Sequence, residues 1–182
     1  MFASVCTLAS TACGDNPFDL LWVASPTTGF VYSLARPELN LPTAYDLVFE
    51  TQVQIQVAGA TGTWDFAVDN VGDGLALLPP GVFGIESTAQ ITSVGSAIPF
   101  SEVARAPTDT TVYVSDEPMM MEMGTVYVMR TNRRAGAGRF GETCFFYVKL
   151  TPLAIDPEEG TLEFIFDRNP SCSDPELVPP PS

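Results

Sequence analysis

Apolar and polar residues alternate along most of this chain. The segment LVFETQVQIQV shows the alternation most clearly, because its apolar side chains occupy one face and its polar side chains the other. The apolar face comprises Leu47, Phe49, Val53, Ile55 and Val57. A period of two is typical of a β-strand that buries one face. We therefore expect a strand over residues 47–57.

Further short segments have the same character. WDFAVD and IESTAQITS alternate in the same way, and FVYSLA, TTVYVS and GTVYVMRT are also rich in strand-forming residues. Turn-forming sequences separate them: GATG, DNVGDG, LLPPG and APTD. No segment has the 3.6-residue period of a helix. The pattern predicts an all-β fold, an antiparallel β-sandwich (immunoglobulin-like or related) of about eight or nine strands.

One pair of segments predicts a hairpin and a disulfide. CFFYVKLTPL and TLEFIF both alternate, and the turn sequence IDPEEG lies between them. A hairpin centred near Glu158 places Leu150 opposite Phe166 and Cys144 opposite Cys172. Cysteines in that position are within reach of a disulfide. The alternative is two buried free thiols, whereas a bond would indicate an oxidising compartment such as the periplasm.

The ends of the chain differ from its middle. We expect a leader-like segment over residues 1–20, one β-sandwich domain over residues 21–172, and a Pro-rich tail over residues 173–182 that has no core of its own. The leader carries the two remaining cysteines, Cys6 and Cys13. Ala12 matches the residue that precedes the cysteine of a bacterial lipobox, whereas Ser10 departs from the usual Leu. Cys13 is therefore the predicted lipid anchor, and the alternative is an ordinary cysteine in a retained segment.

The amino-acid composition limits the kinds of function that this chain can have. The chain has 182 residues, of which 22 are acidic and 8 basic, and its net charge is −14. We expect no nucleic-acid partner from this balance, because phosphate binding requires a basic surface. The absence of histidine removes the Ser-His-Asp and Cys-His catalytic systems and histidine-based metal sites. No pair of carboxylates is distinguished from the others, so we expect neither an enzyme nor a cofactor.

Two segments are candidate interaction surfaces. The run EPMMMEM contributes four methionines, which suit adaptable apolar contact with a partner or a membrane; core packing and copper binding are the alternatives. Since a strand alternates its faces, at least one of three consecutive methionines must point outward. RRAGAGR contributes arginines that suit lipid head groups or an acidic protein, the alternative being a solvated loop. The interface candidates are Met119, Met120, Met121, Met123, Arg133, Arg134 and Arg139.

The segment DNVGDG has an alternative reading as a metal site. Asp69, Asn70 and Asp73 offer oxygen ligands for calcium. A calcium loop requires more ligands at fixed spacing, including a late glutamate. A hairpin turn is therefore the favoured interpretation.

Two stretches carry a resemblance to known proteins. TACGDNPFD and ETCFFYVKLTPLAIDPEEGTLEFIFDRNPSC resemble a group of bacterial lipoproteins with β-sandwich domains. The whole chain resembles the membrane-extrinsic, pigment-free subunits that hold a bacterial type 2 reaction centre inside its light-harvesting ring. This resemblance implies structural rather than chemical work, on the periplasmic side of a membrane. It implies no site residues.

These observations lead to two functional hypotheses. The first is a non-enzymatic, extracytoplasmic structural subunit that braces an integral membrane protein complex, with its leader and tail ordered only by neighbouring proteins. The second is a ligand-binding lipoprotein, for example for glycans, that uses an exposed row of aromatic side chains. The available aromatics are Trp22, Trp64, Tyr113 and Tyr127, of which Trp64 is expected in the core beside Phe66 and Val68.

Overall fold

The computed structural model describes residues 22–180. Within this range the chain forms ten β-strands and three short 3₁₀ helices. The strands are β1 (Thr27–Tyr32), β2 (Ala44–Asp46), β3 (Thr51–Val53), β4 (Phe66–Val71), β5 (Gly74–Leu78), β6 (Gln90–Gly95), β7 (Met119–Met120), β8 (Val126–Arg130), β9 (Tyr147–Asp156) and β10 (Thr161–Arg168). The 3₁₀ helices are η1 (Pro80–Phe83), η2 (Phe100–Glu102) and η3 (Thr110–Val112).

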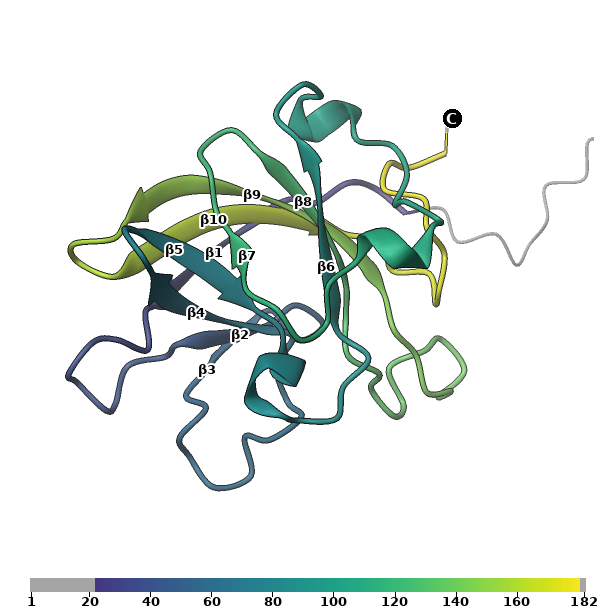
Figure 1. Ribbon diagram of the computed structural model, residues 1–182. Helices are drawn as coiled ribbons and strands as arrows, with labels where there is room; N and C mark the ends of the chain where they lie inside the picture. The colour runs from purple at the N-terminus through teal and green to yellow at the C-terminus, as the bar shows by residue number, and fades with distance from the viewer. Residues whose placement is uncertain (1–21, 181–182) are drawn as a thin grey trace, which may run out of the picture.

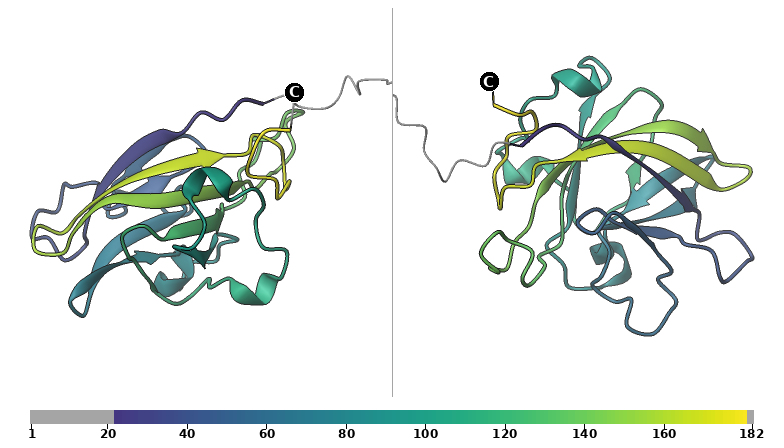
Figure 2. Two further views of the ribbon diagram at one scale, coloured as in Figure 1. Left: turned by 90° about the horizontal axis from the view of Figure 1, so that it is seen from above. Right: turned by 180° about the vertical axis from the view of Figure 1, so that it is seen from behind.

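The strands form two five-stranded sheets, which lie as separate layers in Figure 2. The first sheet has the order β1-β10-β9-β8-β6, and the second has the order β3-β2-β4-β5-β7. Every neighbouring pair is antiparallel. The all-β, antiparallel prediction is confirmed (Figure 1). No helix among residues 22–180 has the length and apolar character needed to cross a bilayer.

The main core lies between the two sheets. It is built from residues that alternate along the strands of both sheets, as a period of two requires. Its buried members include Val31, Leu47, Phe66, Val68, Leu75, Leu77, Ile91, Tyr127, Met129, Val148, Leu150, Leu162, Phe164 and Phe166. Tyr45, on β2 of the second sheet, packs against Phe164 and Phe166 of β10 in the first sheet. The ring centroids are 5.1 and 5.5 Å apart. These edge-on contacts join the sheets at the middle of the sandwich.

The β9–β10 hairpin has the predicted register. Leu150 pairs with Phe166, and the turn lies between Asp156 and Thr161. A register shift between Glu163 and Phe164 changes the pairing only near the turn. Beyond the paired strands, a disulfide joins Cys144 to Cys172, whose Cα atoms are 5.5 Å apart.

The predicted strand over residues 47–57 is wrong. The chain reverses over residues 47–50, and only Thr51–Val53 form a strand, antiparallel to β2. The Asp46 carboxylate causes the reversal, because its Oδ1 accepts hydrogen bonds from the backbone N–H groups of Val48 and Phe49 at 2.8 and 3.0 Å. Phe49 and Val57, expected on the buried face, are 63% and 55% exposed.

The TTVYVS segment is also not the expected strand. Thr110–Val112 form η3, and the Asp109 carboxylate accepts the N–H of Thr111 at its start. Only Val114 makes a β-type bridge, to Ile91. A local cap therefore overrides a weak alternating pattern here, as it does after β2.

Trp64 is buried as expected, but on the other side of the second sheet. It is 1% exposed and packs with Ala44, Ala67, Ala76 and Leu78, away from the core that contains Phe66 and Val68. Small side chains on this outer face of β2, β4 and β5 leave room for the indole ring. The second sheet is consequently buried on both faces around β4.

The outer face of the first sheet is also covered. Segments around η2 and the C-terminal tail supply Val103, Ala106 and Leu177, which pack against Val126 and Val128 of β8. The tail was expected to lack a core of its own, yet Leu177 is 1% exposed. Its N–H donates to the carbonyl of Ala104 at 2.7 Å. As far as residue 180, the tail is thus held by this domain itself.

The segments that pack on the outer face of the first sheet also bury the chain's single lysine. Lys149 on β9 lies opposite Asp167 on β10, and both are less than 5% exposed. The ammonium group donates to the carbonyl of Val103 at 3.4 Å and lies 5.0 Å from the centre of the Phe100 ring. Burial lowers the pKa of Lys149 and raises the pKa of Asp167.

Gly29 is required by close packing within the core. A Cβ atom at this position of β1 would overlap the ring of Phe164 on β10. We predict that Gly29→Ala lowers the free energy of unfolding by about 1–3 kcal/mol, because the buried ring has no free space to enter. Urea unfolding measures the change. The neighbouring control, Thr28→Ala, should cost less than about 1 kcal/mol. Equal losses for both variants would contradict the packing explanation.

Candidate functional site

The predicted arginine segment forms a loop at one end of the sandwich. It follows β8 and returns to Cys144, whose backbone pairs with that of Arg134 through hydrogen bonds of 2.8 and 3.0 Å. The disulfide to Cys172 ties the base of this loop to the chain after β10. Figures 1 and 2 place the loop and the C-terminal tail at the end opposite the β9–β10 turn.

Arg134 does not belong to an exposed surface, which corrects its assignment as an interface residue. It is 7% exposed, and its guanidinium lies 3.4 Å from the Asp46 carboxylate and 3.5 Å from the Asp65 carboxylate. It also donates to the carbonyl of Gly62 at 3.0 Å. The buried carboxylates require a cation, and Arg134 points inward to supply it.

Asp65 is the centre of this buried cluster. Its Oδ2 accepts the N–H of Leu47 at 2.8 Å, and its Oδ1 accepts the N–H of Asn132 at 2.7 Å. One side chain thereby links the end of β2 to the loop after β8. Burial raises the pKa of Asp65 to about 7, opposed by the Arg134 guanidinium and by the two backbone N–H groups.

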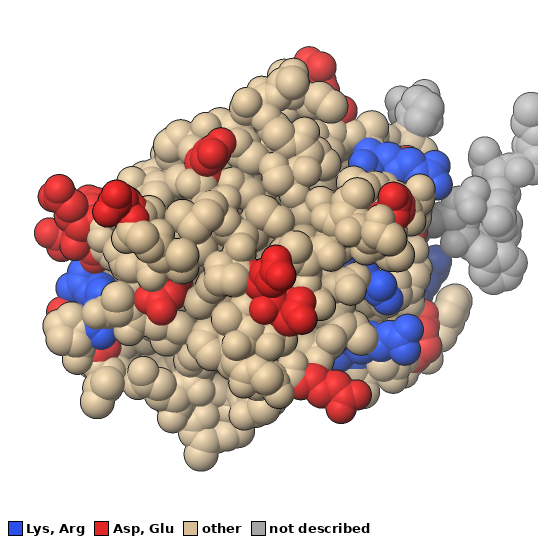
Figure 3. Space-filling view, in the orientation of Figure 1, with Lys and Arg blue, Asp and Glu red and all other residues tan. Residues whose placement is uncertain are grey.

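The other arginines of this end rest on phenylalanine rings. Arg130 and Arg133 both lie over Phe145, with the guanidinium carbons 4.0 and 5.9 Å from the ring centre. Arg168 lies 4.8 Å from the centre of the Phe146 ring. Such contacts favour a cation over the face of the ring. Arg133 is exposed, whereas Arg130 and Arg168 are partly buried. In Figure 3 most of the basic side chains gather over this end of the molecule.

The tip of the loop combines charge with exposed apolar surface. Arg133 and Arg139 are exposed, as expected for an interface, and Arg139 lies 5.7 Å from the centre of the Phe140 ring. Phe140 is 81% exposed. Val23, at the start of the described chain, is 84% exposed, and it lines a hollow of about 200 Å³ together with Arg168 and Pro170. Apolar groups and arginines therefore occur together where the chain enters the domain.

The methionines lie on the second sheet rather than in the arginine loop. Met119 and Met120 form β7 and pair with Leu77 and Ala76 of β5. Met121 is 7% exposed and belongs to the core, whereas Met120 and Met123 are 43% and 57% exposed. The expectation that one of three consecutive methionines points outward is confirmed. Only Met120 and Met123 remain as interface candidates of this segment.

The aromatic residues proposed for glycan binding do not form an exposed row. Trp64 and Tyr127 are each 1% exposed. Tyr113 is half-buried, and its hydroxyl donates to the carbonyl of Pro107 at 3.0 Å. Trp22 is likewise partly accessible. The arrangement gives no support to a stacking platform built from these side chains.

The predicted DNVGDG turn joins β4 to β5. Asp69 and Asn70 accept the Ser33 hydroxyl at 3.1 and 2.6 Å, and the Asn70 amide donates to the carbonyl of Pro157. These side chains thus connect strands rather than surround an ion. Among residues 22–180, no group of three or more acidic or cysteine side chains is arranged to hold a metal.

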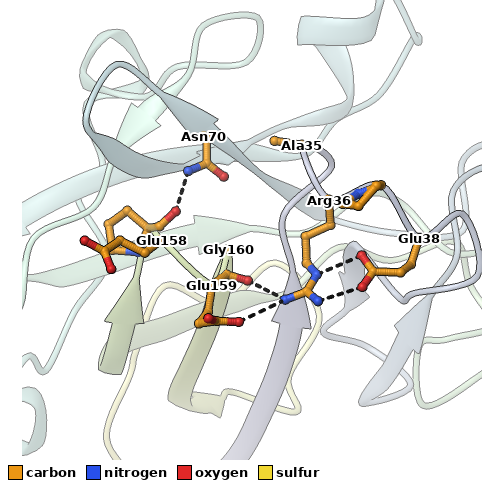
Figure 4. Close-up of a pocket in the computed structure, with 9 residues that line it drawn as sticks. Ala35, Arg36, Glu38, Asn70, Glu158, Glu159 and Gly160 are labelled. Carbon is orange, nitrogen blue, oxygen red and sulfur yellow. Dashed lines mark hydrogen bonds and ion pairs between the residues drawn. The ribbon is translucent and has the colours of Figure 1, made fainter.

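A second hollow of about 430 Å³ lies at the opposite end, beside the β9–β10 turn (Figure 4). Arg36 occupies one wall, where it makes two hydrogen bonds to Glu38 and donates to the carbonyl of Glu159 at 2.6 Å. The bond to Glu38 raises the pKa of Arg36 and lowers that of Glu38. Arg36 therefore pairs with Glu38 and Glu159 within this hollow.

Sequence reasoning missed the partners of Arg134. The alternating pattern gives no sign that Asp46 is buried, and the alternation in WDFAVD predicts that Asp65 lies on the polar face, opposite Trp64 and Phe66. The available signal was an aspartate directly before a buried Leu47, typical of a side chain that accepts backbone hydrogen bonds. Cys13 lies outside the described residues.

Comparisons of the chain with protein-family models, curated proteins and solved structures found no match.

Arg134 and Arg133 allow a matched test of the buried cluster. We predict that Arg134→Met lowers the free energy of unfolding by about 3–5 kcal/mol, because it leaves Asp46 and Asp65 buried without a cation. Arg133→Met makes the same chemical change at an exposed position and should cost less than about 1 kcal/mol. Urea denaturation distinguishes them, and similar losses would show that Arg134 has no special structural role.

Because the pKa of Asp65 is raised in the folded protein, we predict that Asp65 makes the fold more stable at acidic pH than at neutral pH. Between about pH 4 and 7 the folded protein holds a proton on Asp65 that the unfolded chain has lost, so stability falls as the pH rises through this range. One such group contributes up to about 1.4 kcal/mol per pH unit. Urea titrations at several pH values should show a smaller slope for Asp65→Asn than for the natural chain. An unchanged slope would assign the pH dependence to other groups.

Proposed function

We propose that this protein is a non-enzymatic, extracytoplasmic subunit that is attached to a membrane and braces an integral membrane protein complex. The disulfide between Cys144 and Cys172 supports an oxidising location. It also holds the loop that carries Arg133 and Arg139. The location on the periplasmic side of a bacterial membrane follows from the lipobox-like sequence around Cys13 and remains part of the proposal.

The observation that carries the proposal is the asymmetry between the two ends of the domain. Arg133, Arg139 and the most exposed large apolar residues, Phe140 and Val23, belong to the end where the described chain begins. Glu158 and Glu159 lie in the β9–β10 turn at the opposite end (Figure 1). Exposed arginine beside exposed apolar surface is typical of an interface with a protein or a lipid head-group layer.

Chain length is consistent with attachment at the arginine end. Eight residues lie between Cys13 and Trp22, so an extended chain places their Cα atoms at most about 30 Å apart. An anchor at Cys13 would therefore keep the arginine loop close to the bilayer. The net charge of −14 would repel the rest of the domain from anionic lipid. An anchor beside the arginine loop, together with repulsion of the acidic remainder, favours contact with the membrane through the arginine-loop end.

The resemblance to extrinsic subunits of photosynthetic complexes indicates which partner to examine first. A reaction centre within its light-harvesting ring presents a protein surface at the level of the head groups. We propose that the arginine loop contacts such an integral complex and that the exposed Phe140 supplies an apolar anchor for it.

Site-specific photo-crosslinking in native membranes tests this orientation. A photoreactive phenylalanine analogue at Phe140 should crosslink to integral membrane polypeptides, which mass spectrometry of the products identifies. The same analogue at Phe83, which is 41% exposed at the end of η1, serves as the control and should give few such products. The full chain should be retained in the membrane fraction before irradiation.

Two results would overturn the proposal. One is a chain recovered entirely in the soluble fraction. The other is crosslinking that is equal at Phe140 and Phe83, since random collisions with membrane proteins would produce that result. Products with lipid alone at Phe140 would leave membrane attachment in place and remove the bracing role.

A further inference from the structure

Backbone hydrogen bonds join the two sheets at one end of β1. There, the N–H of Tyr32 donates to the carbonyl of Pro42, and the N–H of Leu34 donates to the carbonyl of Val68, both at 2.9 Å. These bonds connect the end of the first sheet's edge strand to the chain of the second sheet. At the beginning of β1, among residues 22–180, the two edges are connected through side chains instead: the Thr27 hydroxyl donates to the Glu50 carboxylate at 3.4 Å, and the Gln52 amide donates to the carbonyl of Phe30.

The beginning of β1 has unpaired backbone groups. Residues alternate along an antiparallel strand between those that bond to the neighbouring strand and those that face away from it. Tyr32 faces away from β10, as does Phe30, whose carbonyl accepts the side-chain amide of Gln52. Thr28 must face the same way. Within residues 22–180, the N–H and C=O of Thr28 and the N–H of Phe30 have no hydrogen-bond partner.

An open groove runs beside these groups. It has a volume of about 700 Å³, with β1 on one wall and β3 on the other. Its lining residues are Thr28, Gly29, Phe30, Tyr45, Glu50, Thr51, Gln52 and Glu163. The lining contains two carboxylates and no basic side chain, so the groove is complementary to positive charge.

We propose that the first half of β1 accepts an extended segment of a partner polypeptide as an added strand. The backbone of that segment pairs with Thr28 and Phe30, and its lysine or arginine side chains meet Glu50 and Glu163. Strand addition of this kind derives affinity from main-chain hydrogen bonds and selectivity from alternate side chains. A short edge limits the number of backbone bonds, so the two carboxylates decide which segment binds. The inference does not depend on membrane attachment.

The probe is an acetylated, amidated eight-residue peptide of alternating lysine and valine, with glutamate replacing lysine in the control peptide. Amide hydrogen exchange of the full chain, read by NMR, should slow at Thr28 and Phe30 when the lysine peptide is added. The glutamate peptide should leave both amides unchanged. Slowing that is absent, or that occurs only at other amides, would overturn the proposal.

Three variants separate strand addition from general attraction to an acidic protein. The double substitution Glu50→Gln with Glu163→Gln should weaken binding of the lysine peptide at least about fivefold. Glu158→Gln with Glu159→Gln removes the same charge at the opposite end and should leave affinity unchanged. Thr28→Pro removes an N–H that faces the open edge, which a sheet tolerates, and should also weaken binding. Urea unfolding verifies that each variant is folded.

Equal affinity for both double variants would show that the peptide binds through net charge alone, and the proposal would then be wrong. Slow exchange at Thr28 and Phe30 without peptide, growing with protein concentration, would assign the edge to a second copy of this chain instead.

Discussion

Burial of the Arg134 guanidinium between Asp46 and Asp65 is the interaction on which the arginine-loop end of this domain depends. Asp46 turns the chain after β2, Asp65 receives backbone N–H groups from both sides of the sandwich, and Arg134 forms an ion pair with each of the two carboxyl groups. Each group is costly to bury alone, so the three constrain one another. Their arrangement sets the start of the loop that carries Arg133 and Phe140.

The fold divides its arginines between structural and surface roles. Arg134 points inward, whereas its neighbour Arg133 lies on the outside over the Phe145 ring. The disulfide from Cys144 fixes the other side of the same loop. A loop held at both sides presents its exposed tip with little loss of conformational entropy on binding, which favours its use as an interface.

The two sheets are joined in different ways at the two ends of β1. Backbone bonds from Tyr32 and Leu34 join the sheets at one end, whereas side-chain bonds from Gln52 to Phe30 and from Thr27 to Glu50 join them at the other. Most proteins protect the edges of their sheets with charge, because an unpaired edge invites another strand. Here Glu50 and Glu163 provide that charge beside an accessible groove. The same carboxylates that discourage pairing between copies of this chain favour a basic partner.

Local pattern was sufficient to predict the all-β class, the β9–β10 hairpin and the pairing of Cys144 with Cys172, because alternation and a tight turn define register without reference to distant residues. It failed over residues 47–57, where Asp46 bonds to the backbone and reverses the chain. The inward direction of Arg134 and the docking of Leu177 depend on residues far away in the sequence. Only the tertiary structure decided them, because burial of a charge or a tail is determined by the groups that meet it in space.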